Sequence, residues 1–408
     1  MAVGAVLDAG SALTAACDDV REATVADAVD GVQPTYVARP GSTRETAEVL
    51  RASTENGLVV VARGAGTKLG WGSPPARVDL LVDLSRLDAV LDHAAGDLVA
   101  VAQAGCPIAR LQNTLASAGQ RLGIDETLPG TTLGGGIATN SSGPRRMLNG
   151  TFRDLMIGTT VVRADGVTAK SGGRVVKNVA GYDLGKLMIG SFGTLAVVTE
   201  AVFRLHPLPA ASHVLCARGA TVEAVAAMVR AAVHSAVVPT AIEVNWPGGE
   251  VGLLLEGTVD GVAARTATAR DLLAGAGAPD VRVSDQLPRW WGSYPAEAVL
   301  LKLSFALSAV EGLLREAARL GVALRGSAGA GVLYGGVPVD ADIVGAVSAL
   351  RSVCTRAGGS LVVLDAPAAV KSTVDTWGPV PALELMRAVK RQFDPQERLA
   401  PGRFVGGI

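Results

Sequence analysis

Between residues 34 and 210 the chain alternates short apolar runs with stretches whose apolar residues recur at helical spacing. The first part predicts a small α+β lobe, in which Ser42 caps a helix that carries Glu45 in its first turn. A second lobe is predicted to start after a glycine-rich stretch near residue 130. The predicted strands cover residues 36–39, 58–62, 80–84, 98–102, 159–163, 167–171 and 195–205, and a second helix covers residues 108–118. Residues 1–33 are rich in alanine and acidic residues and predict a helical extension.

The segment from His206 to Ser212 contains two prolines, which disfavour both a helix and a central strand, so we predict a linker there. Two halves of similar strand and helix pattern follow it. They predict a split-βαβ sheet covered by helices on one side. The end of the chain is helical up to about Phe393 and is predicted to return to the first domain. The predicted divisions are an extension (1–33), a first domain (34–210), a smaller α/β domain (211–380) and a C-terminal segment (381–408).

Length and charge narrow the possible functions. The 408 residues exceed the size of most single cores, which favours two domains. The net charge is −1, and no cluster of Lys and Arg is interleaved with aromatic residues, so nucleic acid is not an expected partner. We also predict no membrane span and no secretory signal, because long apolar runs and an N-terminal basic residue are missing, and we therefore expect a cytoplasmic location.

No metal site is predicted. The cysteines are too far apart for a zinc or iron–sulfur spacing, and they are expected to be reduced thiols, namely Cys17, Cys106, Cys216 and Cys354. No two of the four histidines form a metal-binding pair. His206 and His213, which flank the linker, are too few to hold zinc.

Glycine is over-represented in this sequence. It accounts for 50 of the 408 residues, about 12%, whereas ~7% is usual for proteins. The first cluster, Arg63 to Gly72, follows a predicted buried strand, and its small residues leave backbone N–H groups accessible to a diphosphate. Its GxGxxxG spacing and the lack of a following helix differ from the Rossmann fingerprint. Taken alone, this loop fits a glycine-rich surface turn equally well.

Two further elements change that balance. Pro129 to Gly143 combines five glycines with six hydroxyl or amide side chains and no charge, which suits contact with a large flat ligand and its phosphates. Gly190 to Thr199 places a glycine turn before a strand of small apolar residues, suited to lining a ring system.

Two other glycine-containing runs are not interpreted as ligand sites. The run Gly181 to Lys186 lacks the spacing of a Walker motif, so a nucleotide triphosphatase is not predicted. Gly329 to Gly335 lies between two predicted strands and is interpreted as a structural bend.

The order and spacing of RGAGTxxG, PGTTLGGxIATNSSG and GYDLGKLMIGSFGTLAVVTE resemble the FAD-binding domain of the vanillyl-alcohol oxidase and para-cresol methylhydroxylase (PCMH) superfamily. Within it, Gly143-Pro-Arg-Arg146, Arg153-Asp154 and the segment from Lys177 to Leu184 are similar to the FAD-binding E subunit of bacterial glycolate oxidase. The C-terminal Gln392-Phe-Asp-Pro and Pro401-Gly-Arg403 resemble the end of that family. The resemblance implies an α+β fold, with a PCMH-type two-lobed FAD-binding domain and, by analogy, a smaller α/β cap domain.

The resemblance also implies the residues that bind FAD. Those expected around the pyrophosphate are Arg63, Gly64, Ala65, Gly66, Thr67 and Gly70. Those expected along the rest of the cofactor are Pro129, Gly130, Thr132, Gly135, Gly136, Thr139 and Gly143, with backbone contacts from Gly193 and Val197. Members with covalent flavin have His at the position of Thr67, so non-covalent FAD is expected here. Ala400 stands where relatives often have Asn, which leaves one polar contact near the flavin in doubt.

The function implied is that of an FAD-dependent oxidoreductase acting on CH–OH groups. We expect the FAD-binding subunit of a glycolate oxidase complex, which converts glycolate to glyoxylate and passes electrons to an acceptor such as quinone. A paralogous D-type flavin subunit and an iron–sulfur subunit would be its partners, with at most peripheral contact with the membrane. The alternatives are a self-sufficient oxidoreductase of a small 2-hydroxy acid or alcohol, such as D-lactate, and a scaffold, which the intact glycine loops disfavour.

No catalytic base stands out in the sequence, and the catalytic residues remain unknown. His206 and His213 are the nearest bases, and the proline beside His206 favours a structural role. Candidate partners for a substrate carboxylate are Arg145, Arg146, Arg289 and Lys302. The tandem Trp290 and Trp291, with Trp377, are expected either at a protein interface or, more simply, in core packing.

Overall fold

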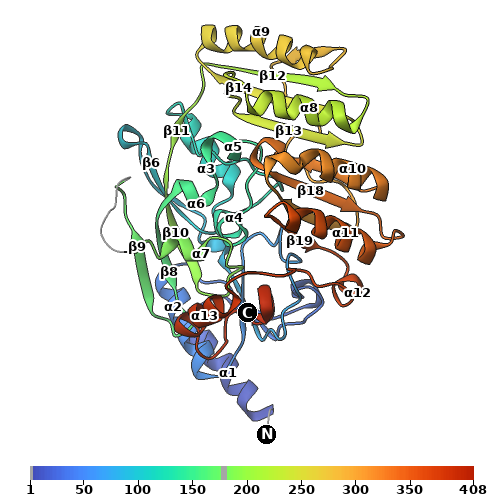
Figure 1. Ribbon diagram of the computed structural model, residues 1–408. Helices are drawn as coiled ribbons and strands as arrows, with labels where there is room; N and C mark the ends of the chain where they lie inside the picture. Colours follow the sequence, from blue (N-terminus) through green and yellow to red (C-terminus); the bar gives the residue numbers. More distant parts are fainter. Residues whose placement is uncertain (1–2, 176–181) are drawn as a thin grey trace.

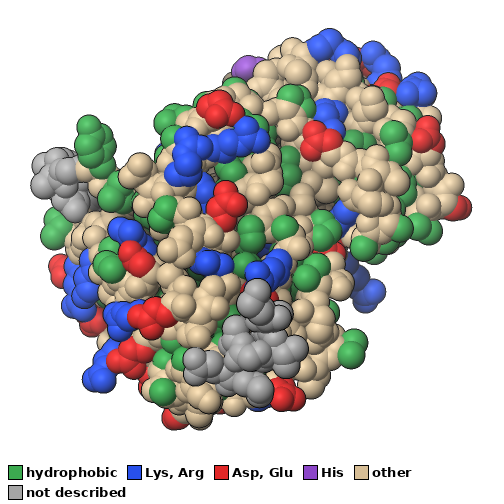
Figure 2. All heavy atoms as spheres, turned by 90° about the horizontal axis from the view of Figure 1, so that it is seen from below, with side chains coloured by type: hydrophobic (Ala, Val, Ile, Leu, Met, Phe, Trp, Pro, Cys, Tyr) green, Lys and Arg blue, Asp and Glu red, His purple; other side chains and the backbone are tan. Residues whose placement is uncertain are grey.

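The computed structural model of the protein describes residues 3–175 and 182–408. Its strands form a four-stranded and a five-stranded sheet in the N-terminal half, a two-stranded sheet, and one eight-stranded sheet in the C-terminal half (Figure 1). Residues 177–181 of the segment that resembles the glycolate oxidase subunit lie outside the described residues. On the face seen in Figure 2, acidic and basic side chains are interspersed, with no extended basic area.

The first sheet has four strands in the order β1-β2-β4-β3. β2, β4 and β3 are parallel, and β1 is antiparallel to β2. The strand bounds are Val20–Glu22 (β1), Tyr36–Ala38 (β2), Val60–Arg63 (β3) and Leu80–Asp83 (β4). Helices α1 (Val3–Ala16) and α2 (Thr43–Glu55) pack against each other. The predicted cap is confirmed, because the Ser42 hydroxyl accepts a hydrogen bond from the Glu45 N–H at 3.1 Å.

The second sheet is antiparallel, with five strands in the order β5-β6-β10-β8-β9. The strand bounds are Val90–Ala94 (β5), Val99–Gln103 (β6), Met156–Val162 (β8), Thr168–Gly172 (β9) and Val197–Arg204 (β10). The expectation that the strand near residues 98–102 belongs to the first lobe was wrong. β6 pairs with β10 along its whole length, and its buried Ala100 and Ala102 lie in the same apolar core as Ala201 and Phe203 of β10.

Short helices connect the two sheets and lie around the glycine loops. Their bounds are Ile108–Ala116 (α3), Leu133–Thr139 (α4), Arg146–Asn149 (α5), Phe152–Leu155 (α6) and Gly185–Met188 (α7). Half of the second glycine loop is therefore helical. Thr132 caps α4, and its hydroxyl accepts a hydrogen bond from the Gly135 N–H at 3.3 Å.

The predicted linker is shorter than expected. His206 and Pro207 form a two-residue strand, β11, which pairs with β7 (Gln120–Arg121), and β12 begins at Ala211. Proline is tolerated in β11 because a strand of two residues needs few backbone donors. Only residues 208–210 lie outside regular structure.

The C-terminal half forms one eight-stranded antiparallel sheet in the order β15-β12-β14-β13-β17-β18-β16-β19. Each half of this sheet follows the succession βαββαβ, and the halves meet where β13 pairs with β17. The first half comprises β12 (Ala211–Arg218), α8 (Val222–Val233), β13 (Ala241–Trp246), β14 (Glu250–Gly257), α9 (Val259–Gly275) and β15 (Val281–Ser284). The second comprises β16 (Val299–Ser304), α10 (Val310–Leu320), β17 (Ala323–Gly326), β18 (Val332–Val337), α11 (Ile343–Arg356) and β19 (Ser360–Asp365). The short turn at Gly329 connects β17 and β18.

One face of the eight-stranded sheet packs against helices α8 to α11 (Figure 1). Alternate residues such as Ile242 and Val244 on β13 belong to that apolar core, so Glu243 between them points to the opposite face. The opposite face is turned toward the glycine loops, because Tyr334 and Leu364 cluster there with Trp71.

The end of the chain packs on the N-terminal half. After α12 (Ala368–Lys371) and α13 (Leu383–Phe393), residue Leu399 forms a parallel bridge with Val60 on β3. The Lys390 ammonium group donates to the carbonyl of Thr194 at 2.8 Å and to that of Leu399 at 2.9 Å.

The predicted limits of the domains stay predictions. Within residues 3–175 and 182–408, no helix has both the length and the apolar character that crossing a bilayer requires.

Candidate functional site

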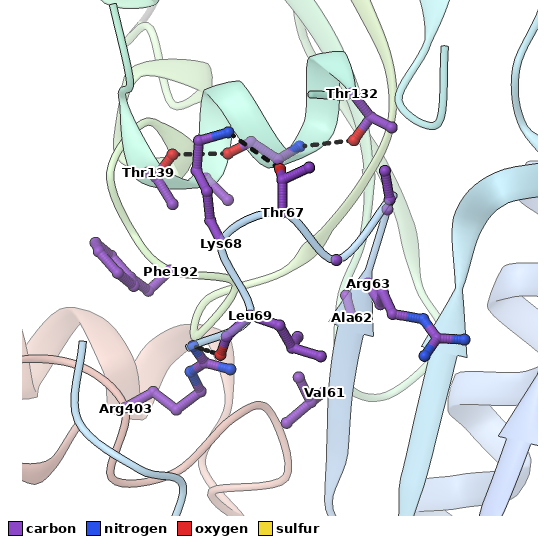
Figure 3. A pocket seen from close by; sticks show the side chains of 15 residues that line it. Val61, Ala62, Arg63, Thr67, Lys68, Leu69, Thr132, Thr139, Phe192 and Arg403 are labelled. Atoms are coloured by element: carbon purple, nitrogen blue, oxygen red, sulfur yellow. Dashed lines mark hydrogen bonds between the residues drawn. The ribbon is translucent and has the colours of Figure 1, made fainter. Parts of the chain in front are cut away.

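A hollow lies between the first and second glycine loops (Figure 3). One part of it continues into a second part through shared lining residues. The first part is lined by residues 61–69, Thr132, Gly135, Ala138, Thr139, Phe192 and Arg403. The second adds Leu84, Ala104, Gly134, Met188, Ser191, Gly193, Ala196, Val197 and Val198.

The structure brings ten of the expected FAD-binding residues together around this hollow. They are Arg63, Gly64, Ala65, Gly66, Thr67, Thr132, Gly135, Thr139, Gly193 and Val197. The other five, Gly70, Pro129, Gly130, Gly136 and Gly143, do not line it. At two of these positions any larger residue would clash. A Cβ atom at Gly136 would lie 2.6 Å from the Phe152 ring, and a Cβ atom at Gly143 would lie 2.4 Å from Asp125.

The backbone of the first loop offers free donors to the hollow. Among the described residues, the N–H groups of Ala65, Gly66 and Thr67 have no hydrogen-bond partner. Gly66 adopts φ +78°, a conformation that glycine takes without strain. Gly66 and Thr67 are half-buried and Ala65 is exposed, and several accessible N–H groups in succession form a concave anion site. This part of the hollow fits a diphosphate.

The side chain of Arg63 has a different role from its backbone. Its guanidinium group points away from the hollow (Figure 3) and pairs with Asp83 at 2.6 Å and with Asp27 at 3.2 Å. These ion pairs hold the end of β3 against β4 and against the N-terminal extension. Arg63 therefore reaches a ligand through its backbone only.

Three buried polar atoms in or just before the second loop have no hydrogen-bond partner among the described residues, but none of their residues lines the hollow. They are the Asn140 side-chain oxygen, the Ser142 hydroxyl and one carboxylate oxygen of Glu126. Such atoms are costly unless something hydrogen-bonds to them. Asn140 and Ser142 lie within the glycine loop, but the sequence offered no means of choosing them over their hydroxyl neighbours.

Lys68 is a lining residue that sequence reasoning missed. Its ammonium group donates to Thr131 at 2.8 Å and lies 5.7 Å from the centre of the Trp71 ring. Burial lowers the pKa of Lys68 to about 8, although the charge of Glu126 acts to raise it. A buried cation beside the free N–H groups favours an anionic ligand. The signal in the sequence is that Arg63 and Lys68 are the only charges in the loop.

Arg145 is not free to bind substrate, contrary to one expectation. It pairs with Asp125 and, at 2.9 Å, with Glu256 on β14, while Arg121 makes two 2.7 Å contacts with the same Glu256 carboxylate. Burial acts to raise the pKa of Glu256, but the ion pairs with Arg121 and Arg145 lower it. This cluster clamps the eight-stranded sheet to the N-terminal half.

Removing the carboxylate of this clamp is expected to destabilise the protein. Glu256→Ala leaves Arg121 and Arg145 largely buried without their shared partner, which costs about 2–3 kcal/mol because Asp125 still pairs with Arg145. Urea unfolding of the full chain measures the loss. The control is Glu223→Ala, which breaks an exposed pair with Arg315 and is expected to cost less than about 1 kcal/mol. Equal losses in the two variants would contradict the clamp.

Arg146 and Lys302, by contrast, both lie at Tyr334, on the cap face that is turned toward the glycine loops, although neither lines the hollow. Lys302 on β16 lies opposite Tyr334 on β18, and Arg146 donates to the Tyr334 hydroxyl at 3.2 Å. Neither cation pairs with a carboxylate in the part of the chain that the structure describes. Burial lowers the pKa of Lys302, and although Tyr334 opposes this effect, the charge of Arg146 adds to it. This cationic corner is suited to a small carboxylate.

Aromatic side chains link the cationic corner to the hollow. Tyr334 packs on Tyr294 with ring centres 4.6 Å apart, and Tyr294 packs on Trp71 of the first glycine loop at 5.8 Å. Phe192, which lines the hollow, belongs to the same apolar cluster.

The remaining candidates lie elsewhere. Arg289 is exposed, and His213 hydrogen-bonds to Thr266 of α9 at 2.9 Å, on the helix-covered side. His206 lies in β11 and does not line the hollow. Trp291 packs over Gly252 beside Trp290, on the sheet face that is turned toward the N-terminal half.

Comparison with known proteins supports a flavin site. A family model described as an FAD binding domain matches residues 34–172, and one described as the C-terminal domain of FAD linked oxidases matches residues 373–404. An uncharacterized FAD-linked oxidoreductase of Mycobacterium tuberculosis is 37% identical over 175 residues, which cover 43% of this chain and 38% of that protein.

Two relatives are subunits of glycolate oxidase. Subunit GlcD of Bacillus subtilis is 33% identical over 52% of this chain and 45% of its own length, and subunit GlcE of Escherichia coli is 37% identical over 38% and 44%. The matches thus span less than half the length of each of these relatives.

A solved structure extends the likeness in fold to the whole chain. The 4-ethylphenol oxidase of Gulosibacter chungangensis has a TM-score of 0.75 at 14% identity and covers 99% of this chain and 97% of its own. The expected α+β fold, with a PCMH-type FAD-binding domain followed by a smaller α/β cap, is confirmed. Residues 34–172 therefore carry a PCMH-type FAD-binding domain, and FAD is the cofactor.

Proposed function

We propose that this chain is the FAD-binding subunit of a glycolate oxidase or dehydrogenase complex. The observation that carries the proposal is the cationic corner of Arg146 and Lys302 at Tyr334, on the cap face turned toward the glycine loops, which suits a small 2-hydroxy acid. The likeness to GlcE of Escherichia coli supports the choice of subunit. The product would be glyoxylate, and a quinone is a suitable acceptor for the electrons.

Within this function, the chain's own residues bind and orient. The N–H groups of Ala65, Gly66 and Thr67 would hold the diphosphate, and Arg146 with Lys302 would hold the substrate carboxylate. When bound, FAD supplies the group that accepts a hydride from the hydroxyl-bearing carbon. Since Thr67 offers no nitrogen for a covalent link, the cofactor is expected to dissociate when the protein is denatured by acid.

The proposed partners are a paralogous D-type flavin subunit and an iron–sulfur subunit. The sequence has no Cys-x-x-Cys spacing, so an iron–sulfur centre would have to belong to another chain. Association with the membrane would then be peripheral and would depend on the complex.

A second candidate is a self-sufficient oxidoreductase of a small 2-hydroxy acid such as D-lactate. It is favoured by the same two cations, because they would let the isolated chain hold a substrate carboxylate without help from a partner subunit. Under both proposals the site would take an anionic substrate. They differ in whether the isolated chain oxidises that substrate.

Anaerobic reduction separates the two. The full chain is purified alone and loaded with FAD, and its visible spectrum is followed after addition of glycolate or D-lactate without oxygen. Under the first proposal the flavin band persists in the isolated chain and bleaches when the D-type subunit is present. Rapid bleaching of the isolated chain would instead favour the self-sufficient enzyme, and a chain that stays colourless with FAD would contradict both.

The carboxylate site can be tested independently of turnover. Lys302→Met is expected to weaken glycolate binding at least tenfold, because one of two charge-assisted contacts is lost, about 1.5 kcal/mol or more. Isothermal titration of the FAD-loaded chain measures the affinity. Arg289→Met, which removes an exposed cation outside the corner, is the control and is expected to bind glycolate as the unmodified chain does. Unchanged affinity in Lys302→Met would place the substrate elsewhere.

A further inference from the structure

Two buried cations hold the far end of the first glycine loop. The carbonyl groups of Leu69 and Trp71 both accept hydrogen bonds from Arg403, each at 2.7 Å. The carbonyl between them, that of Gly70, accepts a hydrogen bond from Lys371. Three consecutive carbonyls are thus fixed by side chains from the last tenth of the sequence. The near end of the same loop carries the free N–H groups of residues 65–67.

Lys371 joins three parts of the chain. It belongs to α12, which follows the last strand of the cap sheet, and its side chain is 0% exposed. Its ammonium group also pairs with Asp30 of the N-terminal extension at 2.6 Å and lies 3.9 Å from Asp365. A lysine ammonium group has three hydrogens to donate, and the Asp30 carboxylate and the Gly70 carbonyl accept two of them.

Neighbouring contacts attach the loop to the same stretch of the cap. The N–H of Gly72 donates to the carbonyl of Leu364 at 2.8 Å, and the hydroxyl groups of Ser73 and Thr376 lie 2.7 Å apart. Residues 364–377, which include Trp377 against Gly72, therefore follow this end of the loop. Of these contacts, only that of Lys371 also reaches the N-terminal extension.

We infer that Lys371 is a positioning residue for FAD, which couples cofactor binding in the first glycine loop to the docking of residues 364–377 of the cap. An anion site made of backbone N–H groups binds well only if the backbone is already ordered, since ordering it on binding costs affinity. Lys371 supplies that order by fixing Gly70. Because coupling between two sites is reciprocal, bound FAD must in turn strengthen the docking of the cap segment.

The simpler alternative is that Lys371 only neutralises the buried Asp30, and a set of variants separates the two roles. Lys371→Met removes the ammonium group at similar side-chain length, and is expected to weaken FAD binding at least tenfold and to lower the stability of the chain. Asp30→Asn combined with Lys371→Met removes the stranded carboxylate. This double variant is expected to regain most of the stability but not the FAD affinity, because Gly70 still lacks its donor.

The measurements are FAD affinity by flavin fluorescence and stability by urea unfolding of the FAD-free chain. The control is Arg265→Met, which removes another cation that donates to backbone carbonyls, those of Val237, Val238 and Glu256, within the cap. It is expected to lower stability and leave FAD affinity unchanged.

Hydrogen exchange tests the reciprocal effect. FAD is expected to slow amide exchange in residues 364–377 of the unmodified chain, and this protection should disappear in Lys371→Met even at saturating FAD. Unchanged FAD affinity in Lys371→Met would overturn the inference. So would a double variant that recovers stability and FAD affinity in parallel, because a purely structural ion pair behaves in that way.

Discussion

Gly66→Asp is expected to weaken FAD binding more than a hundredfold, whereas Gly66→Asn is expected to weaken it only a few-fold. Gly66 lines the hollow with φ +78°, and Asn and Asp are the residues other than glycine that best tolerate such a backbone. A Cβ atom there would have no neighbour closer than 3.7 Å, so either side chain has space. The two variants thus differ mainly in charge.

The size of the effect follows from electrostatics. A carboxylate about 5 Å from a single phosphate charge costs about 3 kcal/mol at an effective dielectric constant near 20, which corresponds to more than a hundredfold in affinity. Titration of each variant with FAD, followed by fluorescence quenching, gives the ratio. Similar affinities of the two variants would mean that the diphosphate does not occupy the nest of residues 65–67.

Local sequence predicted those parts of the fold whose signals are local. The capped helix α2, the buried strand β3 and the repeated strand and helix pattern of the cap all follow from periodicity and capping residues. The glycine loops were recognisable because backbone that approaches a ligand closely excludes side chains. Ten of the fifteen expected cofactor residues indeed lie around one hollow.

Contacts between distant residues were not predictable in this way. Arg63 was expected to contribute to the FAD loop, but nothing near it in sequence indicates that its guanidinium group pairs with Asp27 and Asp83. The place of β6 in the second sheet was not predictable for the same reason, because its partner β10 lies almost a hundred residues further along the chain. Burial and partner choice are tertiary properties, and they decide which of several similar charges is functional.

Arg145 and Arg146 illustrate this limit. They are adjacent in sequence and equally plausible as carboxylate ligands, yet Arg145 is neutralised by Glu256 and Asp125 while Arg146 faces Tyr334. The difference arises from the start of α5, which directs the two side chains to different parts of the cap. Only the docked cap distinguishes them.

Glu243 is the buried acid that sequence reasoning did not single out, and it is expected to make the protein less stable as pH rises. It lies on β13, on the sheet face away from the helices, with 1% of its surface exposed and one carboxylate oxygen unpaired. Burial raises the pKa of Glu243 to about 8, although Ser327 and Arg146 act to lower it. In the unfolded chain the same carboxyl group titrates near its ordinary value of about 4.5.

The direction of this pH dependence follows from the number of protons that Glu243 binds in the folded and unfolded states. Between pH 4.5 and pH 8 the folded protein keeps a proton on Glu243 that the unfolded chain has lost, so the free energy of unfolding falls as pH rises. The stabilisation is complete below pH 4.5 and is lost as pH passes through about 8. The shift corresponds to a loss on the order of 5 kcal/mol from this one group.

Glu243→Gln removes the titrating group and keeps its shape. Its stability relative to the unmodified chain is therefore expected to increase steadily from pH 5 to pH 8, measured by urea unfolding at each pH. Glu297→Gln, which changes an exposed glutamate of the same domain, is the control and is expected to show no such trend. A difference between Glu243→Gln and the unmodified chain that stays constant with pH would mean that Glu243 is ionised in the folded protein, stabilised by Arg146.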